Sequence, residues 1–363
     1  MKAPSQSPYL SRLAKLQKRL AEEKLEALLV SSLPNVHYLT GFSGSAGLLL
    51  ATSKDSLLLT DSRYDLQAHE EVEGSRVAIV KGDLLAAAAK RVPKKRGARI
   101  GFEGQAVSYQ AHRKLRNLLP GRRLVATSEV VELLRMQKEE EEIARIRKAV
   151  EVGSRALQET LPLLRPGVRE QEVAAEIEYR MRLHGAERPS FETIVAFGDH
   201  AALPHARPGD RRLRPKECIL MDLGAILSGY AGDMTRTVFL GKPSRRASRM
   251  YQAVLEALQE AEAVVRAGVT GGQVDAAARK VLKRYEYGRY FTHSTGHGVG
   301  KEVHELPRVA PKQKQPLLER AVITVEPGVY IPGYGGVRIE DVVVVRKDGA
   351  EVLTPTPKEL LVL

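Results

Sequence analysis

The sequence has few of the residues that build disulfide scaffolds or aromatic recognition surfaces. Its 363 residues include one cysteine and no tryptophan, and aromatic residues make up 5%. One thiol excludes an internal disulfide framework and a metal site built from several thiolates. Cys218 opens the apolar run Cys218–Met221, so we interpret it as a buried structural thiol rather than a catalytic one.

Long apolar runs are missing as well. No segment approaches the roughly 20 apolar residues that a membrane-spanning helix needs. The first residues, Met1–Ser7, lack the apolar core of a signal peptide. By default, we expect a cytoplasmic protein with no membrane partner.

The chain does contain an excess of positive charge. It has 57 basic and 44 acidic residues, which gives a net charge of +13. Nucleic-acid binding favours a basic stripe together with a recognisable module, and no zinc-finger or RNA-recognition spacing is present. We interpret the charge as solvated surface and expect no nucleic-acid partner. The basic groups on which this rests are Lys94–Arg96, Arg122–Arg123, Arg211–Arg212 and Arg245–Arg246.

The length and the pattern of apolar residues predict two domains. Helical spacing over residues 9–23, a strand at Ala27–Val30 and a hairpin over residues 44–60 begin an alternation that continues to about residue 130. This alternation indicates a three-layer α/β domain. We place the boundary in the segment Val131–Gln137, which gives domains 1–134 and 135–363.

The second domain is predicted to be α+β, with two related halves. Helices over about 139–163 and 169–184 come first, followed by strand pairs and further helices. Two hairpin-like segments, 218–240 and 321–346, each carry a pair of acids. This repetition suggests that two halves face each other across a site.

The first acidic pair is Asp222 and Asp233. The two residues are symmetric about Leu227 and Ser228. A turn centred there would place the carboxylates directly opposite each other, on one face of neighbouring strands. Like charges in that position are destabilising unless a cation or a proton separates them.

The second pair, Glu326 and Glu340, is symmetric about Gly333 in a glycine-rich turn. One acidic pair could arise by chance, whereas two pairs that are each centred on a turn argue for divalent cations. Between the pairs lies His297, flanked by Gly296 and Gly298, which let the backbone approach closely. Taken alone, His297 would be better explained as a core histidine in a tight turn.

Four carboxylates and one imidazole form an oxygen-rich ligand set. Such a set favours Mn²⁺, Co²⁺ or Fe²⁺ and tolerates Zn²⁺. The four carboxylates also balance the charge of two divalent ions. Two such ions could hold a bridging water or hydroxide as a nucleophile, with its pKa lowered towards ~7.

These residues resemble the pita-bread metallopeptidases, which include methionine aminopeptidase, Xaa-Pro aminopeptidase and prolidase. The resemblance covers essentially all of 135–363 and occupies five ligand positions. Two N-terminal segments, Asn35–Ser45 and Thr60–Tyr64, also resemble the creatinase/prolidase type of N-terminal domain, which methionine aminopeptidases lack. The matching catalytic segments are Met221–Gly224, Asp233–Thr237, His293–Gly300, Val325–Gly328 and Arg338–Asp341.

The resemblance implies a role for each matched residue. Asp222 would bind one metal ion, His297 and Glu326 the other, and Asp233 and Glu340 would bridge the two. Glu326 would also handle the proton of the attacking water. The resemblance implies four further site residues, which position the substrate, stabilise the oxyanion, line the pocket or support the ligands: His205, His304, His293 and Arg338. Without the resemblance, His205 and His304 would be read as ordinary surface or core histidines, and His200 matches nothing.

The resemblance implies a homodimeric, Mn²⁺-dependent enzyme, with Co²⁺ or Zn²⁺ as alternatives, that acts on peptides with proline in second position. Our main hypothesis is an Xaa-Pro aminopeptidase, because the segments Gly41–Gly47 and Thr60–Tyr64 look more like that branch. The close alternative is prolidase, an Xaa-Pro dipeptidase, which needs a cation to hold the proline carboxylate. No arginine or lysine can be assigned that task from the sequence. Remoter alternatives are a non-catalytic binding module and metal-free, creatinase-type hydrolysis, both disfavoured by the complete ligand set.

Overall fold

The computed structural model describes residues 7–363, which form two compact units, Met1–Arg135 and Met136–Leu363. The segment Met1–Ser7, for which no signal peptide is predicted from the sequence, lies almost wholly outside the described residues. Within residues 7–363, no helix combines the length and apolar character needed to cross a membrane.

The N-terminal unit is a six-stranded sheet in the order β4-β3-β2-β1-β5-β6. Only β2 runs antiparallel to its neighbours, and the other pairs are parallel. The strands are β1 (Ala27–Val30), β2 (Gly47–Thr52), β3 (Ser56–Thr60), β4 (Arg76–Ile79), β5 (Arg99–Glu103) and β6 (Arg123–Thr127). The helices are α1 (Pro8–Glu22), α2 (Leu33–Thr40), η1 (Ser62–Tyr64), α3 (Asp65–Glu71), α4 (Leu84–Ala89), α5 (Tyr109–Leu118) and α6 (Glu132–Arg135).

Strand β1 shows why this unit has three layers. All four of its residues are buried, so both faces of the sheet must be covered. Leu28 and Val30 pack on the side of α1, whereas Ala27 and Leu29 pack with residues of α4 and α5. The predicted strand, opening helix and hairpin are therefore confirmed, as is the three-layer arrangement.

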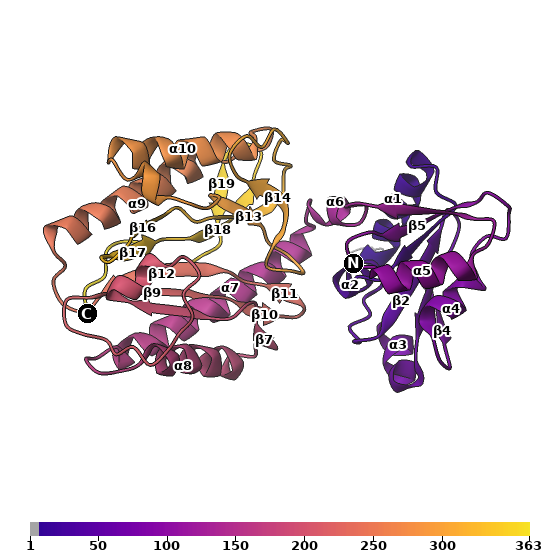
Figure 1. Ribbon diagram of the computed structural model, residues 1–363, viewed down its shortest axis with the longest axis horizontal. Helices are drawn as coiled ribbons and strands as arrows, with labels where there is room; N and C mark the ends of the chain where they lie inside the picture. The colour runs from indigo at the N-terminus through magenta and orange to yellow at the C-terminus, as the bar shows by residue number, and fades with distance from the viewer. Residues whose placement is uncertain (1–6) are drawn as a thin grey trace, which may run out of the picture. The chain divides into compact units, whose positions relative to one another are not determined.

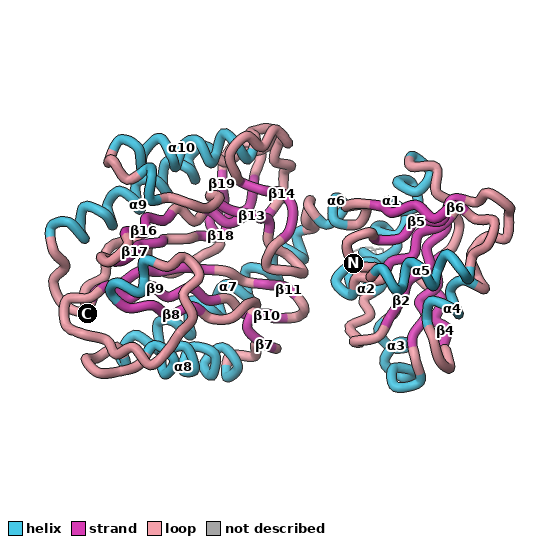
Figure 2. Tube along the Cα trace, viewed as in Figure 1, coloured by secondary structure: helices cyan, strands magenta, loops and turns pink. Residues whose placement is uncertain are grey.

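The C-terminal unit contains two helix pairs and several short sheets (Figure 2). Its helices are α7 (Glu140–Thr160), η2 (Leu161–Leu163), α8 (Glu170–Leu183), η3 (Gly198–Ala202), α9 (Arg245–Val264), α10 (Gly271–Arg284) and η4 (Gly288–Tyr290). Its first strands are β7 (Arg188–Pro189), β8 (Ile194–Phe197), β9 (Cys218–Leu223), β10 (Ala225–Leu227), β11 (Tyr230–Ala231) and β12 (Met234–Phe239). The later strands are β13 (Gly296–Gly298), β14 (Glu305–Val309), β15 (Val322–Val325), β16 (Gly328–Ile331), β17 (Gly335–Arg338), β18 (Asp341–Val345) and β19 (Ala350–Val352).

Each helix pair of this unit covers one group of strands. Residues of α7 and α8 share an apolar core with β9 and β12, in the sheet ordered β12-β9-β8. Residues of α9 and α10 share another core with β15, β16 and β17. Figure 1 shows the strands lying between α9 and α10 on one side and α8 on the other. This arrangement agrees with the two facing halves predicted from the repeated hairpins.

Candidate metal centre

The first acidic pair lies on the β9–β12 hairpin in a register that differs from the predicted one. Asp222 pairs with Thr235, not with Asp233. This register centres the turn between Ser228 and Gly229. Both turn residues have positive φ, 50° and 68°, as a two-residue type I′ turn requires. The prediction of a turn centred one position earlier was therefore wrong, because Ser228 takes the left-handed conformation.

The corrected register places Asp233 diagonally across from Asp222. The two carboxylates still share one face of the hairpin, because Asp233 and Thr235 lie two residues apart. Thr235 occupies the opposite position, and its hydroxyl donates a hydrogen bond of 2.7 Å to Oε2 of Glu340. A neutral hydroxyl, rather than a second carboxylate, thus faces Asp222 directly.

The second acidic pair has the predicted register. Gly328 pairs with Arg338 and Val325 with Asp341, so both ladders are centred on Gly333. Glu326 and Glu340 therefore lie opposite each other, just beyond the ends of these ladders.

The two hairpins are joined by hydrogen bonds that bring their carboxylates together. The amide of Glu340 donates to the carbonyl oxygen of Thr235 at 3.1 Å. The hydroxyl of Thr237 donates to the carbonyl oxygen of Arg338 at 2.9 Å. Donor atoms of Asp233, His297 and Glu340 consequently all lie within 4.8 Å of one another.

His297 completes the cluster from β13. Its Nε2 lies 3.7 Å from Oδ2 of Asp233 and 3.5 Å from Oε1 of Glu326. Its Nδ1 lies 3.1 Å from the carbonyl oxygen of Gly298. Donation from Nδ1–H to that carbonyl leaves the Nε2 lone pair directed at the carboxylates, which is the tautomer of a metal ligand.

The glycines on either side of His297 are required by close backbone contacts. A Cβ on Gly296 would collide with the carbonyl oxygen of Thr324, and one on Gly298 with that of Leu306. These contacts hold β13 against its neighbours and fix the direction of the imidazole. The sequence-based explanation of the glycines, close backbone approach, agrees with this geometry.

The electrostatics of the carboxylates in this cluster favour binding of a cation. Burial, followed by repulsion from Asp222 and Glu326, raises the pKa of Asp233 well above its usual value. Burial and the repulsion of the other carboxylates likewise raise the pKa of Glu340. The pKa of Glu326 is raised to about 7, mainly by burial. Burial lowers the pKa of His297 to about 4, which keeps the ring neutral.

One buried ligand atom points to the same conclusion. Within residues 7–363, Oδ1 of Asp222 is buried and has no hydrogen-bond partner. An orphaned carboxylate oxygen is costly, and a coordinated cation would satisfy it. The oxygen-rich donor set fits divalent metal ions.

Arg338 supports the cluster through three side-chain hydrogen bonds. Its Nη2 donates to Oδ2 of Asp222, its Nε to the Thr235 hydroxyl at 3.0 Å, and its Nη1 to the Tyr330 hydroxyl at 2.7 Å. The Tyr330 oxygen lies 2.8 Å from Nε2 of His293. Tyr330 was not identified from the sequence, because nothing in its spacing distinguishes it from the other residues of a buried strand.

Three further histidines were predicted to belong to the site. The ring of His304 packs against that of His297, with centroids 4.3 Å apart. His304 therefore lies beside His297. Burial lowers the pKa of His293 to about 4, and the Tyr330 hydroxyl links this ring to Arg338. His205 is exposed and follows Pro204, whose carbonyl oxygen accepts from Nη1 of Arg338 at 3.1 Å. His200 instead contacts the buried carboxylate of Glu170 at 2.8 Å through its Nδ1.

A buried ionic network contacts the segment that carries Glu340. Arg236 donates to the carbonyl oxygen of Glu340 at 2.6 Å and to the carboxylate of Asp341 at 2.7 Å. The same guanidinium binds the carbonyl oxygens of Thr356 and Pro357, in the C-terminal segment. Lys358 of the same segment pairs through its ammonium group with both Asp341 and Glu262.

One cation beside the ligands was not assigned from the sequence. Arg308 on β14 lies directly across from His297 on β13. Paired residues of antiparallel strands project their side chains to the same face, with Cβ atoms roughly 5 Å apart. Arg308 is exposed, and in the described part of the chain its guanidinium forms no ion pair or hydrogen bond.

Comparison with known proteins identifies the family of this chain. The profile of metallopeptidase family M24 matches residues 144–347, and that of the creatinase/prolidase N-terminal domain matches residues 12–137. The chain belongs to metallopeptidase family M24. The predicted family resemblance and fold, an α/β N-terminal domain with a pita-bread C-terminal domain, are thereby confirmed.

Relatives within family M24 include both dipeptidases and aminopeptidases. The Xaa-Pro dipeptidase of Pyrococcus furiosus is 37% identical over 352 residues, covering 96% of this chain and 99% of that protein. The structure of an Xaa-Pro dipeptidase from Bacillus anthracis matches with a TM-score of 0.95 and 36% identity, over 98% of this chain and 100% of that one. The structure of an X-Pro aminopeptidase from Thermotoga maritima matches with a TM-score of 0.88 and 36% identity, over 95% of this chain and 100% of that one.

Proposed function

We propose that the protein is a metal-dependent Xaa-Pro dipeptidase. Its five candidate metal ligands are Asp222, Asp233, His297, Glu326 and Glu340. The relatives named as Xaa-Pro dipeptidases or prolidases support this assignment over the aminopeptidase function predicted from the sequence. The observation that carries it is the free guanidinium of Arg308 opposite His297.

Five side chains would hold two divalent cations, with Asp233 and Glu340 bridging them. We propose Mn²⁺ as the native ion, with Co²⁺ or Zn²⁺ as alternatives, because four of the five ligands are carboxylates. The chemistry that such ions supply is polarisation of the scissile carbonyl and acidification of the attacking water. Glu326 would accept the proton of that water.

The remaining residues bind and orient the substrate. His205 and His304 would donate hydrogen bonds to the carbonyl oxygen as negative charge develops on it. His293 would line the pocket for the proline ring. Arg338 would keep the carboxylate of Asp222 oriented, since its guanidinium bonds that carboxylate.

The substrate class follows from the amide and from the carboxylate beyond it. An Xaa-Pro bond has no N–H for a peptidase to grip, so recognition must use other groups. In a dipeptide, the proline carboxylate lies immediately next to the scissile bond. A guanidinium pairs well with a carboxylate, and Arg308 stands beside the ligand cluster in a position to do so.

An Xaa-Pro aminopeptidase is the second candidate function. It is favoured by the Thermotoga maritima X-Pro aminopeptidase, which matches this chain at the same 36% identity as the Bacillus anthracis dipeptidase. In that case, Arg308 would face the remaining peptide and would not bind the proline carboxylate.

Turnover of Gly-Pro and of Gly-Pro-Xaa tripeptides by the Mn²⁺-loaded enzyme distinguishes a dipeptidase from an aminopeptidase. Preference for Gly-Pro supports the dipeptidase, and preference for the tripeptides would favour the aminopeptidase instead. Chelation should abolish either activity and Mn²⁺ should restore it, with Asp233→Ala as an inactive control. Activity that survives complete chelation would overturn metal dependence.

We further propose that domain 135–363 carries the catalytic residues, that domain 1–134 is the creatinase/prolidase-like accessory domain, and that the protein acts as a cytoplasmic homodimer. Light scattering of the purified protein tests the dimer: a mass near 80 kDa is expected, twice the 40.0 kDa of the chain. A mass of 40.0 kDa would exclude it.

A further inference from the structure

One part of the N-terminal unit is almost free of negative charge. Residues 90–123 contain eleven lysines and arginines, and Glu103 is their one acidic residue. We call these eleven side chains the basic surface. They are Lys90, Arg91, Lys94, Lys95, Arg96, Arg99, Arg113, Lys114, Arg116, Arg122 and Arg123. Glu103 does not balance them, because it is buried at the far end of β5 and accepts hydrogen bonds from Ser31, Ser32 and Asn35.

The fold brings together basic groups that look separate in the sequence. The amide of Gly97 donates to the carbonyl oxygen of Gly121 at 2.7 Å, which joins the loop after α4 to the loop before β6. In the next ladder position, Arg99 of β5 is the register partner of Arg123 of β6. Two cations side by side on neighbouring strands repel each other. The Glu26 carboxylate accepts from the amide of Arg99 at 2.6 Å, whereas no carboxylate in the described residues pairs with Arg123, so an anion beside Arg123 would reduce the repulsion.

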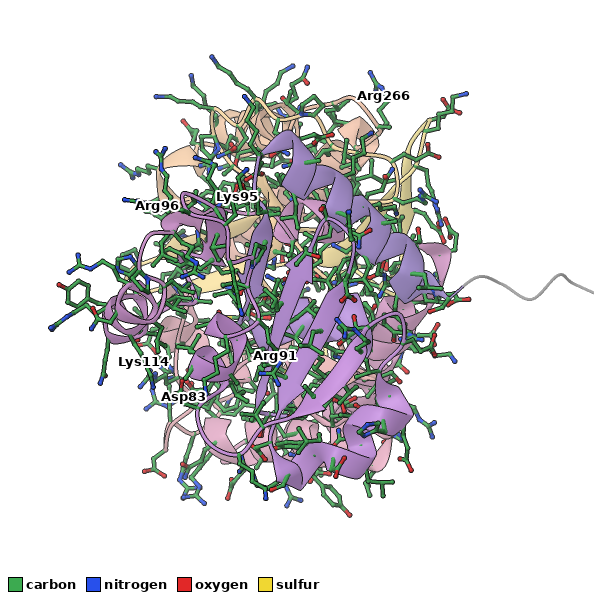
Figure 3. All side chains as sticks on the ribbon, turned by 90° about the vertical axis from the view of Figure 1, so that its right-hand side faces the viewer. Asp83, Arg91, Lys95, Arg96, Lys114 and Arg266 are labelled. Atoms are coloured by element: carbon green, nitrogen blue, oxygen red, sulfur yellow. The ribbon has the colours of Figure 1, made fainter. Side chains whose placement is uncertain are left out.

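Most of these cations have no partner. Lys114 pairs with Asp83 at 2.7 Å, the single ion pair of the basic surface among residues 7–363. Figure 3 shows Lys95, Arg96, Lys114 and Arg91 on this unit, with Asp83 beside Lys114. Three arginines bond backbone carbonyl oxygens, and the other seven cations make no side-chain hydrogen bond or ion pair in the described chain.

Several cations of the C-terminal unit are balanced by nearby acids. There, Arg169, Arg180, Arg211 and Arg346 each contact two carboxylates. Exposed cations without a carboxylate partner among the described residues also occur in that unit, for example Arg245 and Lys280. What distinguishes residues 90–123 is the density of charge, eleven cations with one buried acid among them.

We propose that the basic surface binds the phosphate backbone of nucleic acid, without reading its base sequence. Seven of the eleven cations are arginines, whose planar guanidinium suits phosphate oxygens. Tyr109 begins α5 with 77% of its surface exposed, and its ring offers a platform on which a base can stack. Dispersed charge in the sequence predicted no such partner; the folded arrangement leads to the opposite inference.

A membrane is the less suitable anionic partner. Peripheral helices bind bilayers by inserting an apolar face between the lipids. Of the apolar residues at the end of α5, Leu115 and Leu119 are 0% and 2% exposed because they pack into the core, and Leu118 alone is partly exposed, at 37%. The surface therefore offers charge, one tyrosine ring and a single leucine, which do not make an apolar face to insert.

Binding of a fluorescein-labelled, mixed-sequence single-stranded 20-mer to the full-length protein tests the proposal by anisotropy across a salt series. The wild-type protein should bind with a Kd of roughly 10⁻⁶–10⁻⁴ M near physiological salt, and log K should fall linearly with log salt. The test variant is Lys95→Gln/Arg96→Gln/Arg116→Gln/Arg123→Gln, in which all four side chains are exposed.

This variant should bind at least about tenfold more weakly, and its salt slope should be shallower by about 3, near 0.7 for each phosphate contact removed. A matched control removes four exposed cations from the C-terminal unit, in Arg245→Gln/Lys280→Gln/Lys283→Gln/Lys314→Gln. The control should keep wild-type affinity and slope. Both variants should retain wild-type peptide hydrolysis, which shows that they are folded.

Equal weakening by both variants would overturn the proposal, because binding would then follow net charge and not this surface. An unchanged affinity in the test variant would overturn it as well. Vesicles containing phosphatidylserine provide the last comparison. Binding to vesicles but not to the oligonucleotide would assign the surface to lipid and reject nucleic acid.

Discussion

Thr235 and Glu340 are joined by two hydrogen bonds in opposite directions. The Thr235 hydroxyl donates to Oε2 of Glu340 at 2.7 Å, and the amide of Glu340 donates to the Thr235 carbonyl oxygen at 3.1 Å. The hydroxyl also accepts from Nε of Arg338, whose guanidinium holds Asp222. The position of one hairpin's carboxylate is thus set by a residue of the other hairpin.

Replacing Thr235 by valine should weaken metal binding. Valine has nearly the same shape but cannot donate to Glu340 or accept from Arg338. Loss of a residue that orients a ligand typically costs 10- to 100-fold in metal affinity, and we expect a Mn²⁺ titration of activity to shift by about that factor. Thr235→Ser, which restores the hydroxyl, should recover most of the affinity; equal loss in both variants would contradict the assignment.

Arg308→Met should discriminate between substrates. If the guanidinium holds the proline carboxylate, its removal should raise the KM for Gly-Pro by about 10- to 100-fold, the range of a lost charge-assisted hydrogen bond of ~1.5–3 kcal/mol. The KM for a Gly-Pro amide, which lacks that carboxylate, should change little. A similar rise for both substrates would mean that Arg308 does not recognise the carboxylate.

Gly296→Ala should destabilise the C-terminal unit. The new Cβ would meet the carbonyl oxygen of Thr324 in the neighbouring strand, which cannot move without breaking the ladder. We expect a loss of ~3 kcal/mol or more in the free energy of unfolding, measured by urea denaturation. The matched control is Gly349→Ala, whose Cβ would meet nothing within 4 Å. Equal stability of the two variants would refute this explanation of the glycine.

His293 should make the folded protein sensitive to acid. Burial lowers its pKa from 6.5 to about 4, so its stabilising contribution is fully present above pH 6.5. Between pH 6.5 and pH 4, the unfolded chain binds a proton that the folded chain does not, and the free energy of unfolding falls as pH falls. Urea denaturation at pH 7.5 and pH 5 should show a smaller loss in His293→Gln than in the wild type. An equal loss would show that His293 does not contribute.

Lys358→Met should destabilise the fold through the charges it leaves behind. Lys358 pairs with the buried carboxylates of Asp341 and Glu262, and breaking a buried pair costs roughly 3–5 kcal/mol. Adding Glu262→Gln should recover part of this loss in denaturant unfolding, because one orphaned charge is then removed. The exposed control Lys347→Met should have little effect. If Lys358→Met/Glu262→Gln regains no free energy of unfolding relative to Lys358→Met, the destabilisation comes from lost packing and not from unpaired charge.

The candidate ligands could be found from the sequence because their positions are unusual for acids. Asp222 stands in an apolar strand, where a lone carboxylate is costly to bury, and Glu326 and Glu340 are symmetric about an obvious turn. The first hairpin was misread because positive φ at Ser228 leaves little trace in a sequence. Most residue types rarely adopt that conformation, so the register could not be fixed to within one position.

The supporting residues could not be found in the same way. Arg236 contacts Pro357, 121 residues further along the chain, and no local pattern records a contact of that range. Arg308 is brought beside His297 only by strand pairing. The basic surface is a similar case, because its loops meet through backbone hydrogen bonds, from Gly97 to Gly121 and from Arg123 to Ala98.

The docking of the C-terminal segment against Arg236 has a consequence for biosynthesis. Every candidate metal ligand is translated before Thr356 and Pro357, whose carbonyl oxygens hold that guanidinium behind Glu340. A nascent chain that still lacks these residues has the ligands but not the support that fixes them. Catalytic competence would therefore be acquired only after Thr356 and Pro357 have been synthesised, which delays peptidase activity beyond the translation of the last candidate ligand, Glu340.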